Sequence, residues 1–545
     1  MSIYDQNADK AKQQLDKISP SMCYAKWSQV SMHLTNGMTH SCYHPPTHKV
    51  PLEELEKNIT ALHNTEEKKE QRRLMLKGER PDGCSYCWNI EDQGDRSDRI
   101  YRSGEYWAQE SRQDIMDAGA SGNINPRYVE VNFNQACNFK CSYCSPHLST
   151  AWQEEIDEHG EYPTVAPHNN VDSLRNKNLM PLRVAQDDNP YVTAFWKWWP
   201  DMYKTLRVFR MTGGEPLMDK NTFKVMEYVL ENPNKDLELS ITTNMCPVNQ
   251  VLFERFMTLI KQLDNVEHSA EVYVPDPHDG TDWQTWDHYI VGADSKRYHS
   301  SELPSIEREE IKQTFLQIGQ CEEQGDNSYT YEYKYNDKAY HNFSVFVSLD
   351  GWGPQAEYIR HGMDFDQVWS NVNRFLDETH HTSINFINTF NCLSLPSLRE
   401  FLEGILELRK KWNKSIQYAL GWEVPEQRIW FDIPLLRNPA WQSIQILPDD
   451  YQEYLLEAID FMEQNKANEE FVDYEGFKDF EIEKVKRNLE HMKKQLSKDK
   501  LLRDRADFSK FFSEHDKRRG TDFLATFPEM SQFWFMCEEA EAIYE

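Results

Sequence analysis

Short runs in which apolar and polar residues alternate recur along the middle of the chain. Longer segments with apolar residues at i, i+3 and i+4 separate them. The alternation predicts strands, and the second pattern predicts helices. Because predicted strands and helices alternate along the chain, we expect an α/β fold with a parallel sheet. The predicted strands are 128–134, 206–211, 237–242, 343–349, 384–389 and 442–447, and the helices include 222–230, 250–263, 365–376 and 398–411.

The two ends of the chain follow other patterns. Two short alternating runs, 28–34 and 39–43, flank Gly37 and predict a hairpin. This hairpin belongs to a small cysteine-rich α+β module over residues 1–122. Helical periodicity after about residue 448 predicts a helical C-terminal region. The predicted domains are therefore 1–122, 123–447 and 448–545. Four polar residues in the last domain are predicted to form a solvated turn. They are His515, Asp516, Arg518 and Arg519.

Two insertions interrupt the central domain, near 146–204 and 268–341. Both are rich in aromatic residues, and such clusters predict local cores. The alternative is a lid or a substrate platform over the sheet, because long loops in compact domains are commonly functional. The residues concerned are Trp196, Trp198 and Trp199 in the first insertion and Trp283, Trp286 and Tyr289 in the second.

Composition narrows the functional classes. The chain has 545 residues and a formal net charge of −30, which disfavours non-specific binding to nucleic acid. No apolar run reaches the roughly 18 residues of a membrane span, and the N-terminus lacks an apolar leader, so a cytoplasmic protein is predicted. The basic residues Lys68, Lys69, Arg72 and Arg73 lie in a glutamate-rich helical segment and are predicted to form a solvated face.

Three of the eleven cysteines lie in one short run directly after the strand at 128–134. Cys137, Cys141 and Cys144 have the spacing C-x3-C-x2-C, in CNFKCSYC. Three thiolates from one loop leave a cubane iron–sulfur cluster one ligand short, whereas a closed structural metal site needs a fourth ligand. Taken alone, the run is also compatible with a zinc loop or with three buried thiols.

A second motif, MTGGEP, follows the strand at 206–211. Gly213 and Gly214 let the backbone approach a ligand closely, and the carboxylate of Glu215 can hold an ammonium group. Pro216 completes the motif. By itself this segment is an ordinary turn.

In this order, the two motifs resemble those of the radical S-adenosylmethionine (SAM) superfamily. The resemblance implies a partial (β/α)6 barrel with its chemistry at the carboxyl ends of the strands. It implies that Cys137, Cys141 and Cys144 hold a catalytic [4Fe–4S] cluster whose fourth iron is chelated by SAM. Tyr143 matches the aromatic residue before the third cysteine, and the Gly-Gly-Glu-Pro segment lies against the methionine end of SAM.

Two further segments extend the predicted SAM site. The run SLDGWGPQAEYIRHG resembles a stretch of the same superfamily, which implies that Ser348 and Asp350 contact the SAM ribose or carboxylate and that Arg360 contacts the carboxylate. Asn244 follows the third predicted strand and would face the same cavity. The alternative for each of these residues is an ordinary turn or a helix cap.

A second set of cysteines precedes the first. Cys23, Cys42, Cys84 and Cys87 form the pattern C-x13-G-x4-C, a gap, then C-x2-C. Four thiolates close either a cubane cluster or a zinc tetrahedron, and the ligands are identical for both. The pattern resembles the SPASM and twitch modules that hold auxiliary clusters, and its short form resembles the twitch type. The surrounding sequence is similar to uncharacterised twitch-type radical SAM proteins of phages and marine bacteria.

The resemblance implies an enzyme that cleaves SAM to a 5′-deoxyadenosyl radical and abstracts hydrogen from a substrate. Auxiliary-cluster members often modify peptide or protein side chains, and a flavodoxin- or ferredoxin-type protein would supply electrons. Two alternatives remain open. One is a radical SAM enzyme acting on a small molecule, such as a sugar or an amino-acid derivative. The other is a non-catalytic scaffold that binds an iron–sulfur cluster or zinc.

Overall fold

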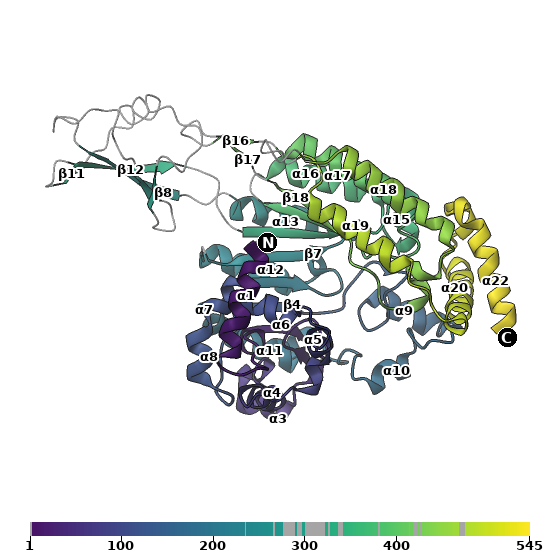
Figure 1. Cartoon of the computed structure of the whole chain (residues 1–545), viewed down its shortest axis with the longest axis horizontal. Helices are drawn as coiled ribbons and strands as arrows, with labels where there is room; N and C mark the ends of the chain where they lie inside the picture. Colours follow the sequence, from purple (N-terminus) through teal and green to yellow (C-terminus); the bar gives the residue numbers. More distant parts are fainter. Residues whose placement is uncertain are drawn as a thin grey trace.

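The computed structural model describes residues 3–234, 236–264, 342–379, 382–413, 427–467 and 475–544, together with short strands between 268 and 335 and between 415 and 425. Its centre is a nine-stranded sheet in the order β18-β15-β13-β7-β6-β4-β1-β2-β3 (Figure 1). Each neighbouring pair of strands from β18 to β1 is parallel. They are β1 (Gln29–His33), β4 (Tyr128–Asn132), β6 (Val208–Thr212), β7 (Glu238–Thr243), β13 (Asn342–Ser348), β15 (Ser383–Ile387) and β18 (Ile429–Asp432).

The first five predicted strands of the central domain are confirmed within two residues at each end. Helices follow them in sequence, as the periodicity predicted. These helices are α12 (Lys220–Glu231), α13 (Gln250–Leu263), α16 (Phe365–Glu378) and α17 (Leu398–Trp412). The fold is therefore mixed α/β with a mainly parallel sheet, and its closure into a partial (β/α)6 barrel remains a prediction.

The sixth predicted strand is wrong. Residues 440–442 and 444–446 form two short 3-10 turns, and the sheet ends instead with β18. Pro439 and Pro448 flank the turns, and proline cannot donate to a sheet ladder. Ile444 and Ile446 are buried from these turns, so their alternation reflects burial rather than a strand.

The N-terminal segment extends the same sheet. Strand β1 pairs in parallel with β4 and antiparallel with β2 (Met38–His40), and β3 (His48–Lys49) forms the edge. The predicted hairpin is confirmed. Gly37 has φ +69°, and a Cβ there would overlap the ring of Tyr191, so both the turn and the packing require glycine.

The remainder of the N-terminal segment is helical and surrounds a small core of its own. One cluster of buried apolar side chains includes Met22, Cys23, Trp27 and Trp107. A larger cluster runs through the sheet and the C-terminal helices, from Val30 to Cys537. The N-terminal helices include α1 (Ile3–Asp16), α4 (Glu66–Leu76), α5 (Ser85–Glu91) and α6 (Asp98–Gly104). The predicted domain boundaries stay predictions.

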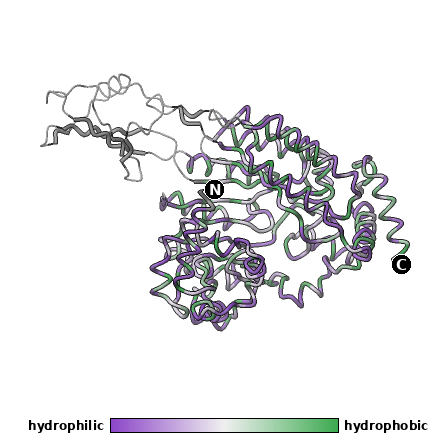
Figure 2. The backbone as a smooth tube through the Cα atoms, in the orientation of Figure 1, coloured by the Kyte–Doolittle hydropathy of each residue, from purple (hydrophilic) through white to green (hydrophobic). Residues whose placement is uncertain are grey.

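The C-terminal region is helical, as predicted, and packs back onto the sheet domain. Hydrophobic and hydrophilic stretches both occur along its helices (Figure 2). Arg409 of α17 and Glu481 of α19 form a fully buried ion pair at 2.6 Å that joins the two parts. The helices are α18 (Gln452–Gln464), α19 (Asp479–Met492), α20 (Lys498–Arg519) and α22 (Ser531–Tyr544). No helix in the described part of the chain is both long and apolar enough to cross a membrane.

The first insertion lies within the described residues, whereas only short strands of the second are described. In the first, α11 (Pro190–Tyr203) buries Trp198 and Trp199, which supports the predicted local core. In the second, β8 (His268–Pro275), β12 (Ser328–Tyr335), β9 (Tyr289–Val291), β10 (Arg297–His299) and β11 (Glu322–Gln324) form a separate antiparallel sheet. Trp283 and Trp286 lie outside the described residues.

Candidate functional site

The three cysteines of the C-x3-C-x2-C run are brought together in the loop after β4. Within this loop, β5 (Lys140–Cys141) pairs antiparallel with β14 (Arg360–His361), which places Cys141 opposite Arg360. Burial, and then the neighbouring Cys141 thiol, raise the pKa of Cys137 to about 12. Burial also raises the pKa of Cys144, and the neighbouring thiols of Cys141 and Cys137 raise it further. The three thiols therefore lie within electrostatic range of one another in one buried loop.

The glycines of MTGGEP pack against the backbone of this cysteine loop. The Gly214 N–H donates to Asn134 O at 3.3 Å, and the Glu215 N–H donates to Ala136 O at 2.6 Å. A Cβ on Gly214 would lie 2.3 Å from Ala136 O. Gly213 has φ +135° and similarly little space. The two motifs therefore form one backbone unit, which gives both glycines a structural reason.

Glu215 is a buried carboxylate at the centre of this unit. Its side chain is 1% exposed and accepts hydrogen bonds from Leu217 N at 3.0 Å, Thr243 Oγ1 at 2.7 Å and Asn244 N at 2.7 Å. Burial nevertheless raises its pKa to about 7. Across the described ranges, no Lys, Arg or His forms an ion pair with it. A ligand ammonium would supply the missing countercharge.

Tyr143, Asp350 and Arg360 form a second buried polar group beside Cys141. The Tyr143 hydroxyl donates to Asp350 Oδ2 at 2.6 Å, and Arg360 Nε lies 2.7 Å from the same oxygen. Arg360 Nη2 donates to the Tyr143 hydroxyl at 2.6 Å, while Nη1 donates to Cys141 Sγ at 3.5 Å. These predicted SAM contacts thus bind one another, and together they hold a guanidinium beside a cysteine sulfur.

The remaining predicted SAM contacts lie at the same carboxyl edge of the sheet. Ser348 ends β13 and is half-buried. Asn244 directly follows β7, and its Nδ2 donates to Asn138 Oδ1 at 3.0 Å. Asn138 belongs to the cysteine loop and was not predicted as a site residue. Its position between two cysteines is the one signal that could have identified it.

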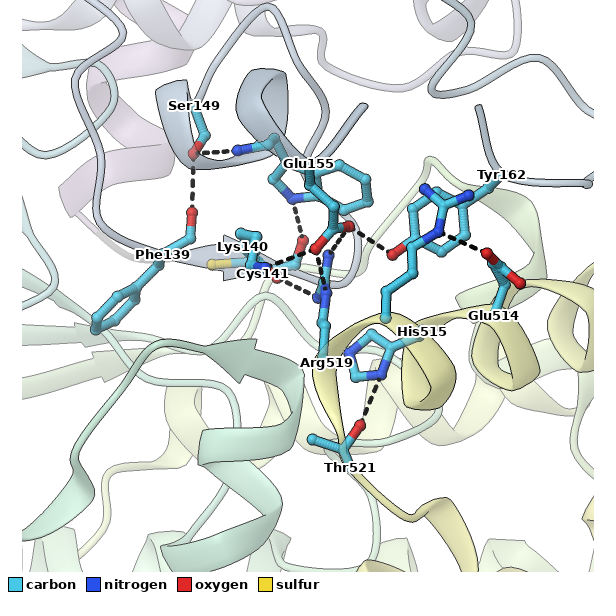
Figure 3. A network of polar contacts seen from close by, with 12 residues as sticks. Phe139, Lys140, Cys141, Ser149, Glu155, Tyr162, Glu514, His515, Arg519 and Thr521 are labelled. Carbon is cyan, nitrogen blue, oxygen red and sulfur yellow. Dashed lines mark hydrogen bonds and ion pairs between the residues drawn. The ribbon is translucent and has the colours of Figure 1, made fainter. Parts of the chain in front are cut away.

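Residues of helix α20 lie against the cysteine loop, with Arg519 beside Lys140 and Cys141 (Figure 3). Arg519 Nη1 donates to Lys140 O at 2.7 Å, directly before Cys141. The same guanidinium pairs with Glu155 at 3.0 Å, and Lys140 Nζ also reaches Glu155 at 2.7 Å. The Arg519 side chain is fully buried, and so is His515. The predicted solvated turn is therefore wrong, because these residues pack against the loop instead of facing water.

The four N-terminal cysteines also come together. Cys23, Cys42, Cys84 and Cys87 all line one cavity of about 20 Å³. Burial raises the pKa of Cys42 to about 12, and it does the same for Cys87. None of the described cysteines forms a disulfide. The predicted hairpin and C-x2-C turn thus bring their thiols to one place.

Three basic side chains, Lys26, Arg99 and Arg102, line this cavity. Lys26 is 2% exposed, and Lys68 and Arg72 of α4 are both 0% exposed. The prediction of a solvated basic face is wrong for Lys68 and Arg72, although Lys69 and Arg73 do lie nearer the surface. Lys26 Nζ donates to Gln71 Oε1 at 2.7 Å, Lys68 Nζ lies 2.9 Å from His63 Nδ1, and Arg72 Nη1 donates to Asn64 Oδ1 at 2.9 Å.

No carboxylate within the described ranges pairs with Lys26, Lys68 or Arg72. Burying an uncompensated cation costs several kcal/mol. Four thiolates around a metal or cluster carry a net negative charge that would offset this cost. The donor set and its surroundings therefore fit an anionic thiolate centre, while in the described residues no three His, Cys, Asp or Glu side chains are arranged around a single ion position.

No protein-family model matches the chain. A segment of 117 residues, 22% of the chain, is 25% identical to GTP 3′,8-cyclase of Sulfurimonas denitrificans and 28% identical to that of Campylobacter curvus. Part of this chain is similar to radical SAM enzymes. The match spans about a quarter of those relatives, 27% of each.

Solved structures of Streptococcus suis SuiB also align with the chain. The SAM-bound structure covers 83% of this chain and 71% of SuiB, at 12% identity and a TM-score of 0.30. The structure bound to the precursor peptide SuiA covers 80% of this chain and 70% of SuiB, at 11% identity and a TM-score of 0.28.

Proposed function

We propose that this protein is a radical SAM enzyme. One observation carries the proposal. Three thiols of a single loop share a backbone unit with Glu215, a buried carboxylate with which no cation among the described residues forms an ion pair. A cubane cluster needs three protein thiolates and leaves one iron open, and a SAM ammonium would offset the carboxylate. The partial similarity to radical SAM enzymes supports the same conclusion.

Each residue then has a defined task. Cys137, Cys141 and Cys144 would hold the [4Fe–4S] cluster, and Glu215 would hold the SAM ammonium. Arg360, fixed by Asp350 and Tyr143, keeps a positive charge beside Cys141. The bound cluster and SAM would supply reductive cleavage of SAM and hydrogen abstraction from the substrate.

The remaining predicted SAM contacts keep their proposed roles. The peptide N–H of Asn244 already orients Glu215, and Ser348 is available at the adjacent strand end for a ribose hydroxyl or a carboxylate. Gly213, Gly214 and Pro216 shape the turn that carries the carboxylate.

The N-terminal cysteines would form a second, twitch-like centre. Cys23, Cys42, Cys84 and Cys87 line one cavity, and the basic side chains that also line it, Lys26, Arg99 and Arg102, would offset part of the charge of four thiolates. We propose an auxiliary [4Fe–4S] cluster, with zinc as the alternative metal. Four protein ligands leave no open iron, so electron transfer suits this centre better than substrate binding.

The proposed substrate is a peptide or protein side chain, and a small molecule such as a sugar or an amino-acid derivative is the alternative. A flavodoxin- or ferredoxin-type donor would reduce the cluster, and the proposed location of the enzyme is the cytoplasm. A non-catalytic scaffold that binds an iron–sulfur cluster or zinc is the other alternative; it would use the thiols but would not need the buried carboxylate of Glu215 beside them.

Anaerobic reconstitution with iron, sulfide, SAM and dithionite tests the proposal directly. We expect about eight irons per chain, from two four-iron centres, and release of 5′-deoxyadenosine. About four irons with one zinc would assign zinc to the N-terminal site. A reduced, fully loaded protein that releases no 5′-deoxyadenosine would contradict the proposed function.

Glu215→Gln is expected to weaken SAM binding at least about tenfold, because a charge-assisted hydrogen bond contributes roughly 1.5–3 kcal/mol. The substitution keeps the volume of the side chain and removes its charge. Anaerobic equilibrium dialysis with labelled SAM measures the affinity, and iron content serves as the control. An unchanged affinity at normal iron content would mean that the segment is only a turn.

Replacing Cys84 and Cys87 together with serine should spare SAM cleavage in the absence of substrate, because their centre lies apart from the three-cysteine loop. Conversion of the true substrate should be lost. The spectrum of the remaining cluster reports whether the sheet domain has folded. If that spectrum is normal and SAM cleavage is nevertheless lost, the two centres do not have separate roles.

A further inference from the structure

A large open cleft lies beside the C-terminal helices. Its volume is about 1130 Å³. Its walls are the end of β18 and the segment that follows it, from Asp432 to Arg437, together with residues of α19, of the turn after α19 and of the first turns of α20. Asp98 of the N-terminal segment also lines it. This volume exceeds the roughly 300–1,000 Å³ of ordinary small-molecule sites, so the cleft suits an extended ligand.

The acidic side chains of the cleft are already paired. Asp432 binds Lys484 at 2.9 Å, and Asp98 contacts His44 at 2.5 Å. The other two acids bind basic residues next to the cleft: Glu490 pairs with Lys493 at 2.6 Å, and Asp504 pairs with Arg503 at 3.3 Å.

Four basic side chains of the cleft are not paired. Arg437, Arg487, Lys494 and Lys500 are exposed, and no carboxylate in the described part of the chain forms an ion pair with them. All four charges lie in the wall of the same cleft. Burial is the largest cause that lowers the pKa of His491, another residue of the cleft. The positive charges of Lys494 and Arg437 lower it further. A protein with a formal charge of −30 thus leaves one cleft with unpaired positive charge.

The rest of the lining mixes polar residues, such as Ser443, Gln445 and Asn488, with apolar ones. The apolar residues include Ile433, Pro434, Leu435, Leu436 and Leu496. None of the described residues that line the cleft is Phe, Tyr or Trp, so it offers no platform on which bases could stack. Cations interspersed with aliphatic side chains match a polypeptide that carries both acidic and apolar side chains.

We propose that this cleft binds an acidic, apolar-containing segment of a polypeptide substrate. The proposal rests on the proposed function and narrows its substrate class. The cleft lies next to the four-cysteine cavity, because Asp98 lines both. Arg437 also lies over the ring of Tyr86, between Cys84 and Cys87, at 5.9 Å from its centroid. The cleft begins at the carboxyl end of β18, on the edge of the sheet that carries the SAM site.

Fluorescence anisotropy with a short labelled peptide of alternating glutamate and leucine tests the proposal on the full chain. Binding should weaken with rising salt, and a lysine–leucine peptide should bind much less tightly. Arg487→Glu with Lys494→Glu should weaken binding roughly tenfold or more, because two attractive charges become repulsive. Lys197→Glu with Lys410→Glu changes the net charge equally at exposed positions away from the cleft, and it should leave binding unchanged.

Three results would overturn the proposal: no binding of the acidic peptide, equal loss in both double variants, or tighter binding of oligothymidylate than of the peptide. The last result would indicate a nucleic-acid ligand. Release of 5′-deoxyadenosine without peptide should be the same in the Arg487→Glu/Lys494→Glu variant as in the original chain. A failure of SAM cleavage in both would count against the radical SAM function, and loss of peptide binding alone would not.

Discussion

Replacing Cys137, Cys141 and Cys144 together with alanine is expected to abolish release of 5′-deoxyadenosine and to lower the iron content from about eight to about four per chain. These three thiols are all the cysteines of this loop. The four N-terminal cysteines line a separate cavity and should retain their centre. Iron analysis and electron paramagnetic resonance of the reduced protein measure both effects.

A matched control is available at Cys246. This thiol is also buried near the loop, but it donates to Gln367 Oε1 at 3.1 Å. Cys246→Ala should keep about eight irons and retain SAM cleavage. Retention of all iron by the triple variant, or loss of a cluster in Cys246→Ala, would contradict the assignment of ligands.

Glu155→Ala is expected to destabilise the protein by about 3–5 kcal/mol, because it leaves the guanidinium of Arg519 buried without its partner. The side chains of Glu155 and Arg519 are 3% and 0% exposed. The pair lies beside Lys140 and Cys141 of the cysteine loop (Figure 3). Denaturant unfolding monitored by circular dichroism measures the change. Glu154→Ala removes an exposed carboxylate from the same helix and should change stability little. Equal effects of the two variants would show that the buried pair contributes nothing specific.

The pH dependence of stability gives an independent test of the same pair. Burial works to raise the pKa of Glu155, but hydrogen bonds from Arg519, Lys140 and Tyr162 hold it at about 2, below its ordinary value of 4.5. Since the folded state lowers this pKa, the contribution of Glu155 is complete above about pH 4.5 and is lost as the pH falls toward 2. The Glu155→Ala variant should therefore lose less stability than the original chain over this interval.

Much of the candidate site could be predicted from sequence because its determinants are local. The three cysteines and the Gly-Gly-Glu-Pro segment each follow a strand directly, so identifying the strands also placed both motifs at one edge of the sheet. The hairpin at Gly37 has the same origin, since its turn and its alternating strands occupy adjacent residues.

Contacts between distant residues could not be predicted in this way. Local alternation did not distinguish the 3-10 turns that bury Ile444 and Ile446 from a sixth strand, because burial of every second residue occurs in both. Strand pairing distinguishes the two cases, because β18 and not residues 442–447 forms the hydrogen-bonded pair with β15 at this edge of the sheet.

Charged residues showed the largest difference between sequence and structure. The sequence by itself determined the two cysteine sets, the strand ends that carry the predicted SAM contacts and the acidic character of the chain. Only the tertiary structure buried Lys68 and Arg72 and placed Arg519 against the loop of Cys141. The physical reason is that burying a charge depends on its partners, and the partner of Arg519 lies 364 positions away, at Glu155.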